Sequence, residues 1–211
     1  MKRIVVLISG RGSNLLALLQ TELGGRIERV ICNNPSAKGL DIARSHGVAW
    51  EVVDHRNFPD REQFDQALAE RIEAAQPNLI VLAGFMRILT EAFIQRFPGR
   101  IINIHPSLLP AFPGTHTHAR ALKEGVKIHG CTVHFVTPAL DHGPIIVQAV
   151  VPVVEGDDEA TLAARVLQSE HRVLAQAIHW FLADRLSVVE GRVILADASS
   201  PATTMISPQL C

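Results

Sequence analysis

Residues 3–19 read R-I-V-V-L-I-S-G-R-G-S-N-L-L-A-L-L, and this pattern indicates the class of fold. The run from Arg3 to Ser9 is continuously apolar and rich in β-branched residues, which is typical of a strand buried on both faces of a parallel sheet. A glycine loop follows, and from Leu15 to Leu23 the apolar residues recur at helical spacing. The order of strand, glycine loop and helix predicts the first unit of an α/β fold.

The same alternation continues along the chain. Apolar, β-branched runs predict strands, and segments with helical spacing separate them: strands over 26–33, 49–54, 79–83 and 100–104, and helices over 37–46, 60–75 and 90–97. The helix over 60–75 is the clearest, because its apolar residues lie four apart and Pro77 follows its end. We therefore predict an α/β fold with a doubly wound, mostly parallel sheet and helices on both faces.

The pattern changes after Gly114. A short helix over 116–123 precedes two β-rich runs, 129–136 and 144–154, and the turn between them is too short to hold a crossover helix. These runs predict an antiparallel C-terminal extension of the sheet. A long helix over 158–182 and a weak strand pair follow, and we expect a single domain over 1–197 with a flexible tail over 198–211.

Composition narrows the class of protein. Hydrophobic residues make up 47% of the chain, charged residues 19%, and the formal net charge is −1, as in an ordinary soluble enzyme. The 20 basic residues form no stripe, so neither nucleic acid nor an anionic membrane is an expected partner. No apolar run is long enough for a signal sequence or a membrane span. The three cysteines lie far apart without metal-type spacing, which indicates a reducing compartment, so we expect a cytoplasmic protein.

The glycine loop at 10–14, G-R-G-S-N, places backbone N–H groups at a helix N-terminus, where phosphates bind. Position 15 is leucine rather than the third glycine of a dinucleotide fingerprint, and the second strand ends in Asn33-Asn34 rather than in an acid. The loop also lacks the lysine of a P-loop. We therefore expect a single phosphate ester as the ligand, with Ser13 and Asn14 adding donors; the alternative is a tight turn that needs glycine for its own sake.

A second polar feature lies in residues 101–114, which read I-I-N-I-H-P-S-L-L-P-A-F-P-G. Strand geometry places Asn103 and His105 on one face and the flanking isoleucines on the other. An amide can donate to a developing oxyanion and an imidazole can move a proton near neutral pH, so the pair suits attack on a carbonyl without a protein nucleophile. The alternative is a histidine that merely caps a buried strand. Both polar features fall at the carboxyl ends of predicted strands, where α/β sheets bind ligands.

A carboxylate could hold His105 in its charged form. The best candidate is Asp141 in the turn L-D-H-G-P at 140–144, although a solvated turn aspartate is the alternative. The chain has ten histidines, but neither an H-E-x-x-H motif nor a Cys/His knuckle, so no metal site is expected. The absence of a G-x-S-x-G elbow argues against a serine hydrolase.

Five segments, in order between residues 3 and 182, together resemble a known family: S-G-R-G-S-N at 9–14, L-A-G-F-M-R-I-L at 82–89, N-I-H-P-S-L-L-P at 103–110, P-G-x-H at 113–116 and L-D-x-G-P at 140–144. The chain resembles the folate-dependent formyltransferases. Its G-x-G-S-N loop and its short length resemble the glycinamide ribonucleotide branch of that family.

The resemblance implies formyl transfer from 10-formyltetrahydrofolate, used as a co-substrate without a metal, to the amine of 5-phosphoribosylglycinamide in purine biosynthesis. It places the family's catalytic trio on Asn103, His105 and Asp141. It also implies a phosphate-binding half at about 1–100 and a folate-binding and catalytic half at about 101–197. One departure is His142, where the family pattern has a smaller residue between aspartate and glycine.

The resemblance further implies two sets of binding residues. The ribonucleotide would be held by the loop residues and by a glutamate near its sugar: Gly12, Ser13, Asn14 and Glu170. The folate would be held by a lining segment, an arginine that meets its tail, and the strand asparagine: Met86, Arg87, Ile88, Leu89, Arg61 and Asn103. We expect the chain to act as a monomer or a homodimer.

Three other functions use related features. A methionyl-tRNA formyltransferase would need a further C-terminal domain and a basic surface, and a formyltetrahydrofolate hydrolase usually has an additional N-terminal regulatory domain. We expect neither extra domain in this chain. A non-catalytic folate- or nucleotide-binding module is the third alternative, but it would have little need for the full set of asparagine, histidine and aspartate.

Overall fold

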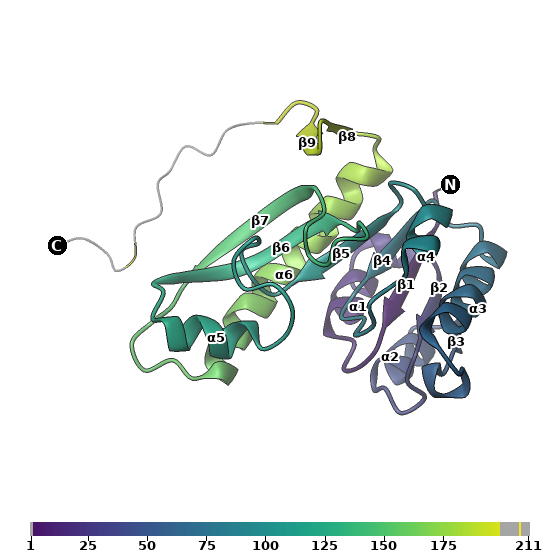
Figure 1. Ribbon diagram of the computed structural model, residues 1–211, viewed down its shortest axis with the longest axis horizontal. Helices are drawn as coiled ribbons and strands as arrows, with labels where there is room; N and C mark the ends of the chain where they lie inside the picture. Colours follow the sequence, from purple (N-terminus) through teal and green to yellow (C-terminus); the bar gives the residue numbers. More distant parts are fainter. Residues whose placement is uncertain (1, 199–206, 208–211) are drawn as a thin grey trace. The chain divides into compact units, whose positions relative to one another are not determined.

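The computed structural model describes residues 2–198 and 207, which fall into two compact units (Figure 1). The first unit contains the chain up to Ile104 together with Phe135–Leu140, and the second contains His105–His134 and the chain from Asp141 onward. The tail predicted over 198–211 lies outside the described residues except for 198 and 207. None of the helices in the described ranges is long and apolar enough to cross a membrane.

Seven strands form one sheet in the order β3-β2-β1-β4-β5-β6-β7. Their bounds are β1 (Ile4–Ile8), β2 (Ile27–Cys32), β3 (Trp50–Val52), β4 (Leu79–Leu82), β5 (Ile101–His105), β6 (Ile128–Phe135) and β7 (Ile145–Pro152). The first five strands pair in parallel, whereas β6 and β7 are antiparallel. The predicted doubly wound, mostly parallel sheet with an antiparallel extension is confirmed.

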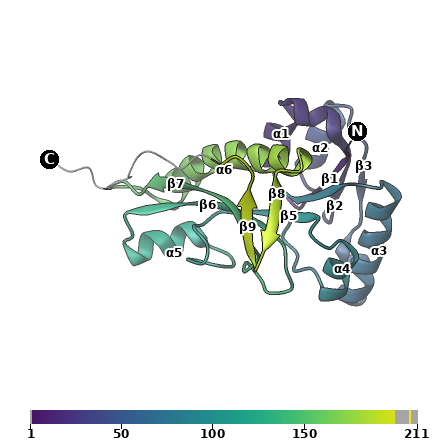
Figure 2. The ribbon, with the colours of Figure 1, turned by 90° about the horizontal axis from the view of Figure 1, so that it is seen from above.

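In the first unit, strand order reverses direction between β1 and β4, which is the switch point where doubly wound sheets bind ligands. Four α-helices and two short 3₁₀ helices connect the strands: α1 (Ser13–Leu19), η1 (Glu22–Arg26), α2 (Gly39–Ser45), η2 (His55–Asn57), α3 (Arg61–Ala74) and α4 (Glu91–Arg96). Figure 2 shows α1 and α2 on one face of these strands and α3 and α4 on the other. The apolar side chains of the core under α3 and α4 include Val5, Leu7, Ile31, Phe64, Leu68, Ile80 and Phe93.

Local signals set the helix ends. The Asp60 side chain accepts from the Gln63 amide at 2.8 Å and begins α3. The predicted helix through Leu23 is interrupted, because the Thr21 hydroxyl donates to the Leu18 carbonyl at 2.8 Å and accepts from the Leu23 amide at 3.2 Å. Thr21 therefore ends α1 early and starts η1.

The second unit is built on the β6–β7 hairpin, with α5 (Thr117–Glu124), the long α6 (Glu159–Leu182) and a separate hairpin of β8 (Leu186–Val189) and β9 (Arg192–Leu195). A capping box between Asp158 and Thr161 begins α6. Just before it, Asp157 makes two hydrogen bonds with Arg165, at 2.7 and 2.8 Å. The apolar face of α6 is buried through Leu162, Val166, Leu174, Ala177 and Ile178.

Candidate functional site

The glycine loop of the first unit has no room for a side chain at Gly12. This residue precedes α1 in the left-handed conformation, with φ of 77°, and a Cβ atom there would lie 2.6 Å from the Gly39 Cα atom. The Gly39 amide also donates to the Gly10 carbonyl at 3.0 Å. The loop therefore needs glycine at position 12 for its own geometry. The backbone amides of Ser13 and Asn14 come next, at the start of α1.

The 86–89 segment of the first unit follows β4 and exposes two apolar side chains. Met86 is 69% exposed and Ile88 is 53% exposed, whereas Leu89 is buried in the core. The Arg87 guanidinium lies 6.0 Å from the Phe64 ring centre. Exposed methionine and isoleucine side chains on one loop are suited to covering the apolar face of a ligand.

Arg61, the predicted partner of the folate tail, is the first residue of α3. Its Nη2 atom lies 3.9 Å from the Glu62 carboxylate, and its side chain is about half exposed. This weak, exposed ion pair leaves the guanidinium accessible to an anion in solution.

Strand β5 carries both candidate residues of the N-x-H motif. Asn103 is half-buried and His105 is buried. The His105 Nε2 atom lies 3.1 Å from the Phe112 carbonyl oxygen, and its Nδ1 atom lies 3.7 Å from Asp141 Oδ1. Both ring nitrogens of His105 therefore face oxygen atoms of the second unit.

Asp141 is held in place by the fold and is not a solvated turn residue. Its backbone has φ of 55°, and its side chain is only 8% exposed. The Gly114 amide donates to its Oδ2 atom at 2.7 Å, so the P-G-x-H segment orients the carboxylate beside His105. The neighbouring His142 is exposed. The structure thus brings His105 and Asp141 together.

Two further histidines of the second unit, His118 and His129, lie near this pair, and no role for them was predicted from the sequence. Their ring centres are 5.3 Å apart and perpendicular, and Phe112 packs against His129 at 5.8 Å. Burial, with His118 adding to it, lowers the pKa of His129 to about 4, and burial also lowers the pKa of His118. Burial thus favours the neutral form of both rings. Within residues 2–198 and 207, no group of three or more His, Cys, Asp or Glu side chains could hold a metal ion.

Glu170, the predicted ribose contact, is a buried carboxylate in the middle of α6. The pKa of the Cys131 thiol in β6 is raised to about 12, mainly because the thiol is buried. The negative charge of Glu170 contributes to the same increase. The Cys131 thiol is thus unreactive at neutral pH.

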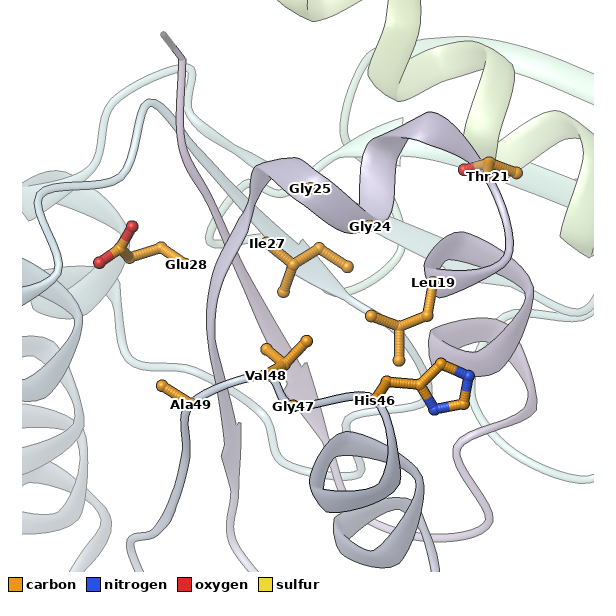
Figure 3. Close-up of a pocket in the computed structure, with 10 residues that line it drawn as sticks. All are labelled: Leu19, Thr21, Gly24, Gly25, Ile27, Glu28, His46, Gly47, Val48 and Ala49. Carbon is orange, nitrogen blue, oxygen red and sulfur yellow. The ribbon is translucent and has the colours of Figure 1, made fainter.

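An open cavity of about 450 Å³ lies elsewhere in the first unit (Figure 3). Leu19, Ile27, Val48 and His46 are among its lining residues, and it opens where β2 and β3 begin. The predicted ligand edge is at the opposite, carboxyl ends of the strands. The cavity contains none of the predicted site residues.

Comparisons with known proteins give a consistent result. Residues 2–178 match the model of the family described as formyl transferase. The chain is 47% identical over 191 residues to phosphoribosylglycinamide formyltransferase of Escherichia coli, covering 89% of this chain and 90% of that protein.

The fold of the chain is also similar to that of solved structures. Glycinamide ribonucleotide transformylase 1 from Symbiobacterium toebii matches with a TM-score of 0.91 and 48% identity, covering 93% of this chain and 95% of that one. A formyltetrahydrofolate deformylase from Pseudomonas syringae matches with a TM-score of 0.85 and 31% identity, covering 93% of this chain and 67% of the deformylase.

Proposed function

The chain belongs to the formyl transferase family, and we propose that Asn103, His105 and Asp141 carry out its reaction. The enzyme is a folate-dependent phosphoribosylglycinamide formyltransferase of purine biosynthesis. It transfers the formyl group of 10-formyltetrahydrofolate to the amine of 5-phosphoribosylglycinamide, which gives the N-formyl ribonucleotide and tetrahydrofolate. The observation that carries the catalytic proposal is the buried contact of His105 with Asp141, 3.7 Å apart.

The reaction needs stabilisation of negative charge and movement of one proton. The substrate amine attacks the formyl carbon, and the carbonyl oxygen becomes an oxyanion. We assign the Asn103 amide and the charged His105 ring as donors to that oxygen, with His105 donating through Nε2 in place of its contact with the Phe112 carbonyl; one such donor is typically worth about 3 kcal/mol of barrier. When the tetrahedral intermediate breaks down, the folate nitrogen leaves and receives the proton that the amine loses.

Asp141 has two tasks in this proposal. Its Oδ1 atom faces His105 at 3.7 Å, so its negative charge favours the imidazolium. Its Oδ2 atom accepts from the Gly114 amide at 2.7 Å, which fixes the carboxylate without neutralising it. A carboxylate fixed in this way can also accept the amine proton through a water molecule and pass it on.

We also propose which residues bind the two substrates. Gly12, Ser13 and Asn14 would hold the phosphate of the ribonucleotide, because backbone amides at the start of α1 suit a single phosphate ester. The exposed Met86 and Ile88 would cover the folate, with Arg87, Leu89 and Asn103 beside it and Arg61 at its anionic tail. Glu170 would contact the sugar of the ribonucleotide. We further propose that the enzyme works in the cytoplasm as a monomer or homodimer.

A hydrolase reaction is the main competing function, because the same trio could admit water in place of an amine. The deformylase that this chain resembles has about a third of its length outside the match. Charged methionyl-tRNA is the other formyl acceptor to be tested.

The test is turnover of 10-formyltetrahydrofolate with three acceptors in parallel: 5-phosphoribosylglycinamide, charged methionyl-tRNA and water alone. We expect formyl transfer to the ribonucleotide alone. Tetrahydrofolate release without an acceptor would establish the hydrolase reaction instead. His105→Asn, run beside the wild type, should keep both substrate KM values within a few-fold and lose most of kcat; a near-normal kcat would remove His105 from the mechanism.

A further inference from the structure

A single hydroxyl joins three strand ends in the first unit. Ser9 directly follows β1 and directly precedes the glycine loop. Its Oγ atom donates to Asn33 Oδ1 at 2.6 Å and accepts from the Met86 amide at 2.7 Å. Asn33 follows β2, and Met86 lies in the loop after β4, so Ser9 links the carboxyl ends of β1, β2 and β4.

The direction of these hydrogen bonds is fixed. The backbone N–H of Met86 can only donate, so the Ser9 proton must point to Asn33. The buried Asn33 amide then turns its Nδ2 atom toward His55. The His55 Nδ1 atom lies 3.2 Å from that nitrogen and 2.9 Å from the Asn33 carbonyl oxygen, and its tautomer decides whether it accepts from the first or donates to the second. Ser9 is thus a hydroxyl with one defined acceptor and one defined donor, and such hydrogen bonds favour one arrangement of the backbone.

The same loop is anchored at its other end. The Thr90 amide donates to Asp65 Oδ2 at 2.6 Å, and the Asp65 side chain is 1% exposed. Between these two anchors the loop exposes the apolar side chains of Met86 and Ile88, whose exposed fractions are 69% and 53%. The position of this exposed apolar pair therefore depends on the hydrogen bonds of the backbone at residues 86 and 90.

We propose that Ser9 is a positioning residue for the folate substrate, acting through the backbone of Met86. The inference rests on the proposed function for the identity of the ligand that the 86–89 segment binds. Ser9 lies next to the glycine loop, yet its side chain is directed to the folate-lining segment and to Asn33. Its loss should therefore affect binding of the folate more than binding of the ribonucleotide.

The test compares Ser9→Ala with Ser9→Thr, which keeps the hydroxyl, and with Thr21→Val. Thr21 is a matched control, because its hydroxyl also makes two hydrogen bonds in the first unit, but at the cavity of Figure 3 where the strands begin. The readouts are the Kd of tetrahydrofolate, the KM of each substrate, kcat, and the exchange rate of the Met86 amide proton measured by NMR.

We expect Ser9→Ala to raise both the Kd of tetrahydrofolate and the KM of the formyl-folate substrate by about 3- to 10-fold, the loss of one hydrogen bond. The ribonucleotide KM should change less than about 2-fold by the same reasoning, because its loop keeps its own contacts. Met86 amide exchange should become faster in Ser9→Ala and stay slow in Ser9→Thr and Thr21→Val.

An unchanged folate Kd in Ser9→Ala, or equal effects of Ser9→Ala and Thr21→Val on it, would overturn the inference. If Ser9→Thr fails to fold, Ser9→Ala and the Met86 exchange rate still decide the outcome. Binding of tetrahydrofolate is measured without turnover, so an enzyme that used another formyl acceptor would refute the proposed function and leave this test intact.

Discussion

Asp141 faces His105 from a turn in which its own backbone is left-handed, with φ of 55° and a carboxylate oxygen 3.7 Å from the imidazole Nδ1 atom. Asparagine tolerates the left-handed conformation as well as aspartate does, and its amide oxygen can still accept from Gly114. The substitution Asp141→Asn therefore removes the charge while it keeps the turn.

We expect Asp141→Asn to lower kcat by about 100-fold or more, the usual range for loss of a group in acid–base catalysis, with small changes in both KM values. Steady-state kinetics at pH 7 measures this effect. Asp184→Asn is the control, because Asp184 is also a turn aspartate with φ of 56° but follows α6 and is exposed. Equal kcat values for the two variants would show that the Asp141 charge has no part in catalysis.

Gly12→Ala should destabilise the protein by about 3 kcal/mol, because it combines a left-handed alanine with a clash against Gly39. Gly10→Ala provides the comparison, since a Cβ atom there meets nothing within 4 Å. Urea unfolding of both variants measures the difference. A Gly12→Ala protein as stable as Gly10→Ala would mean that the loop can open away from α2.

The pKa of His129 predicts a pH-dependent stability. Burial keeps this ring neutral in the folded protein, with a pKa of about 4 against an ordinary value of 6.5. The unfolded chain binds the proton more readily than the folded protein does. The contribution of His129 to the free energy of unfolding is therefore fully present above pH 6.5 and is lost as the pH drops toward 4. The free energy of unfolding would fall by roughly 3 kcal/mol over this pH range.

His129→Asn should flatten this dependence between pH 6.5 and 4, whatever its effect on stability at pH 7. Urea unfolding at a series of pH values gives the slope for each protein. The control is His142→Asn, which changes an exposed side chain. An unaltered slope in His129→Asn would mean that the buried ring is already charged in the folded protein.

Arg61→Ala should raise the KM of the formyl-folate substrate about 3- to 10-fold and leave the ribonucleotide KM unchanged, because only the folate carries a carboxylate tail for this guanidinium. The effect should shrink as ionic strength rises. Arg71→Ala, another exposed arginine of α3, is the matched control. Equal folate KM values in the two variants would refute the assignment of Arg61.

The parallel sheet was predictable because its strands are short, continuous apolar runs. The Arg3 to Ser9 run contains β1, and the short turn after 129–136 correctly predicted the antiparallel extension. The end of α1 was not predictable from spacing, because apolar residues continue past it to Leu23 and the Thr21 hydroxyl decides the break.

The sequence predicted which residue types form the candidate site, but it could not predict which of them are in contact. The sequence suggested His105 and Asp141, but their proximity depends on a left-handed turn that no periodicity encodes. Ser9 was missed because a serine at the end of a strand is ordinary until its partners are known. Asp65 had a usable signal: it lies three and four residues before the buried Leu68 and Ala69, which places an acid on the apolar face of α3.

The exposure of Met86 gives the enzyme a chemical vulnerability. A thioether that is 69% exposed is open to peroxides, and its conversion to the sulfoxide puts a polar, chiral group where the proposed folate surface is apolar. The lesion is repaired by methionine sulfoxide reductases, so oxidative stress would slow this step reversibly. Bound folate would shield the sulfur, and the saturated enzyme would outlast the empty one in an oxidising cell.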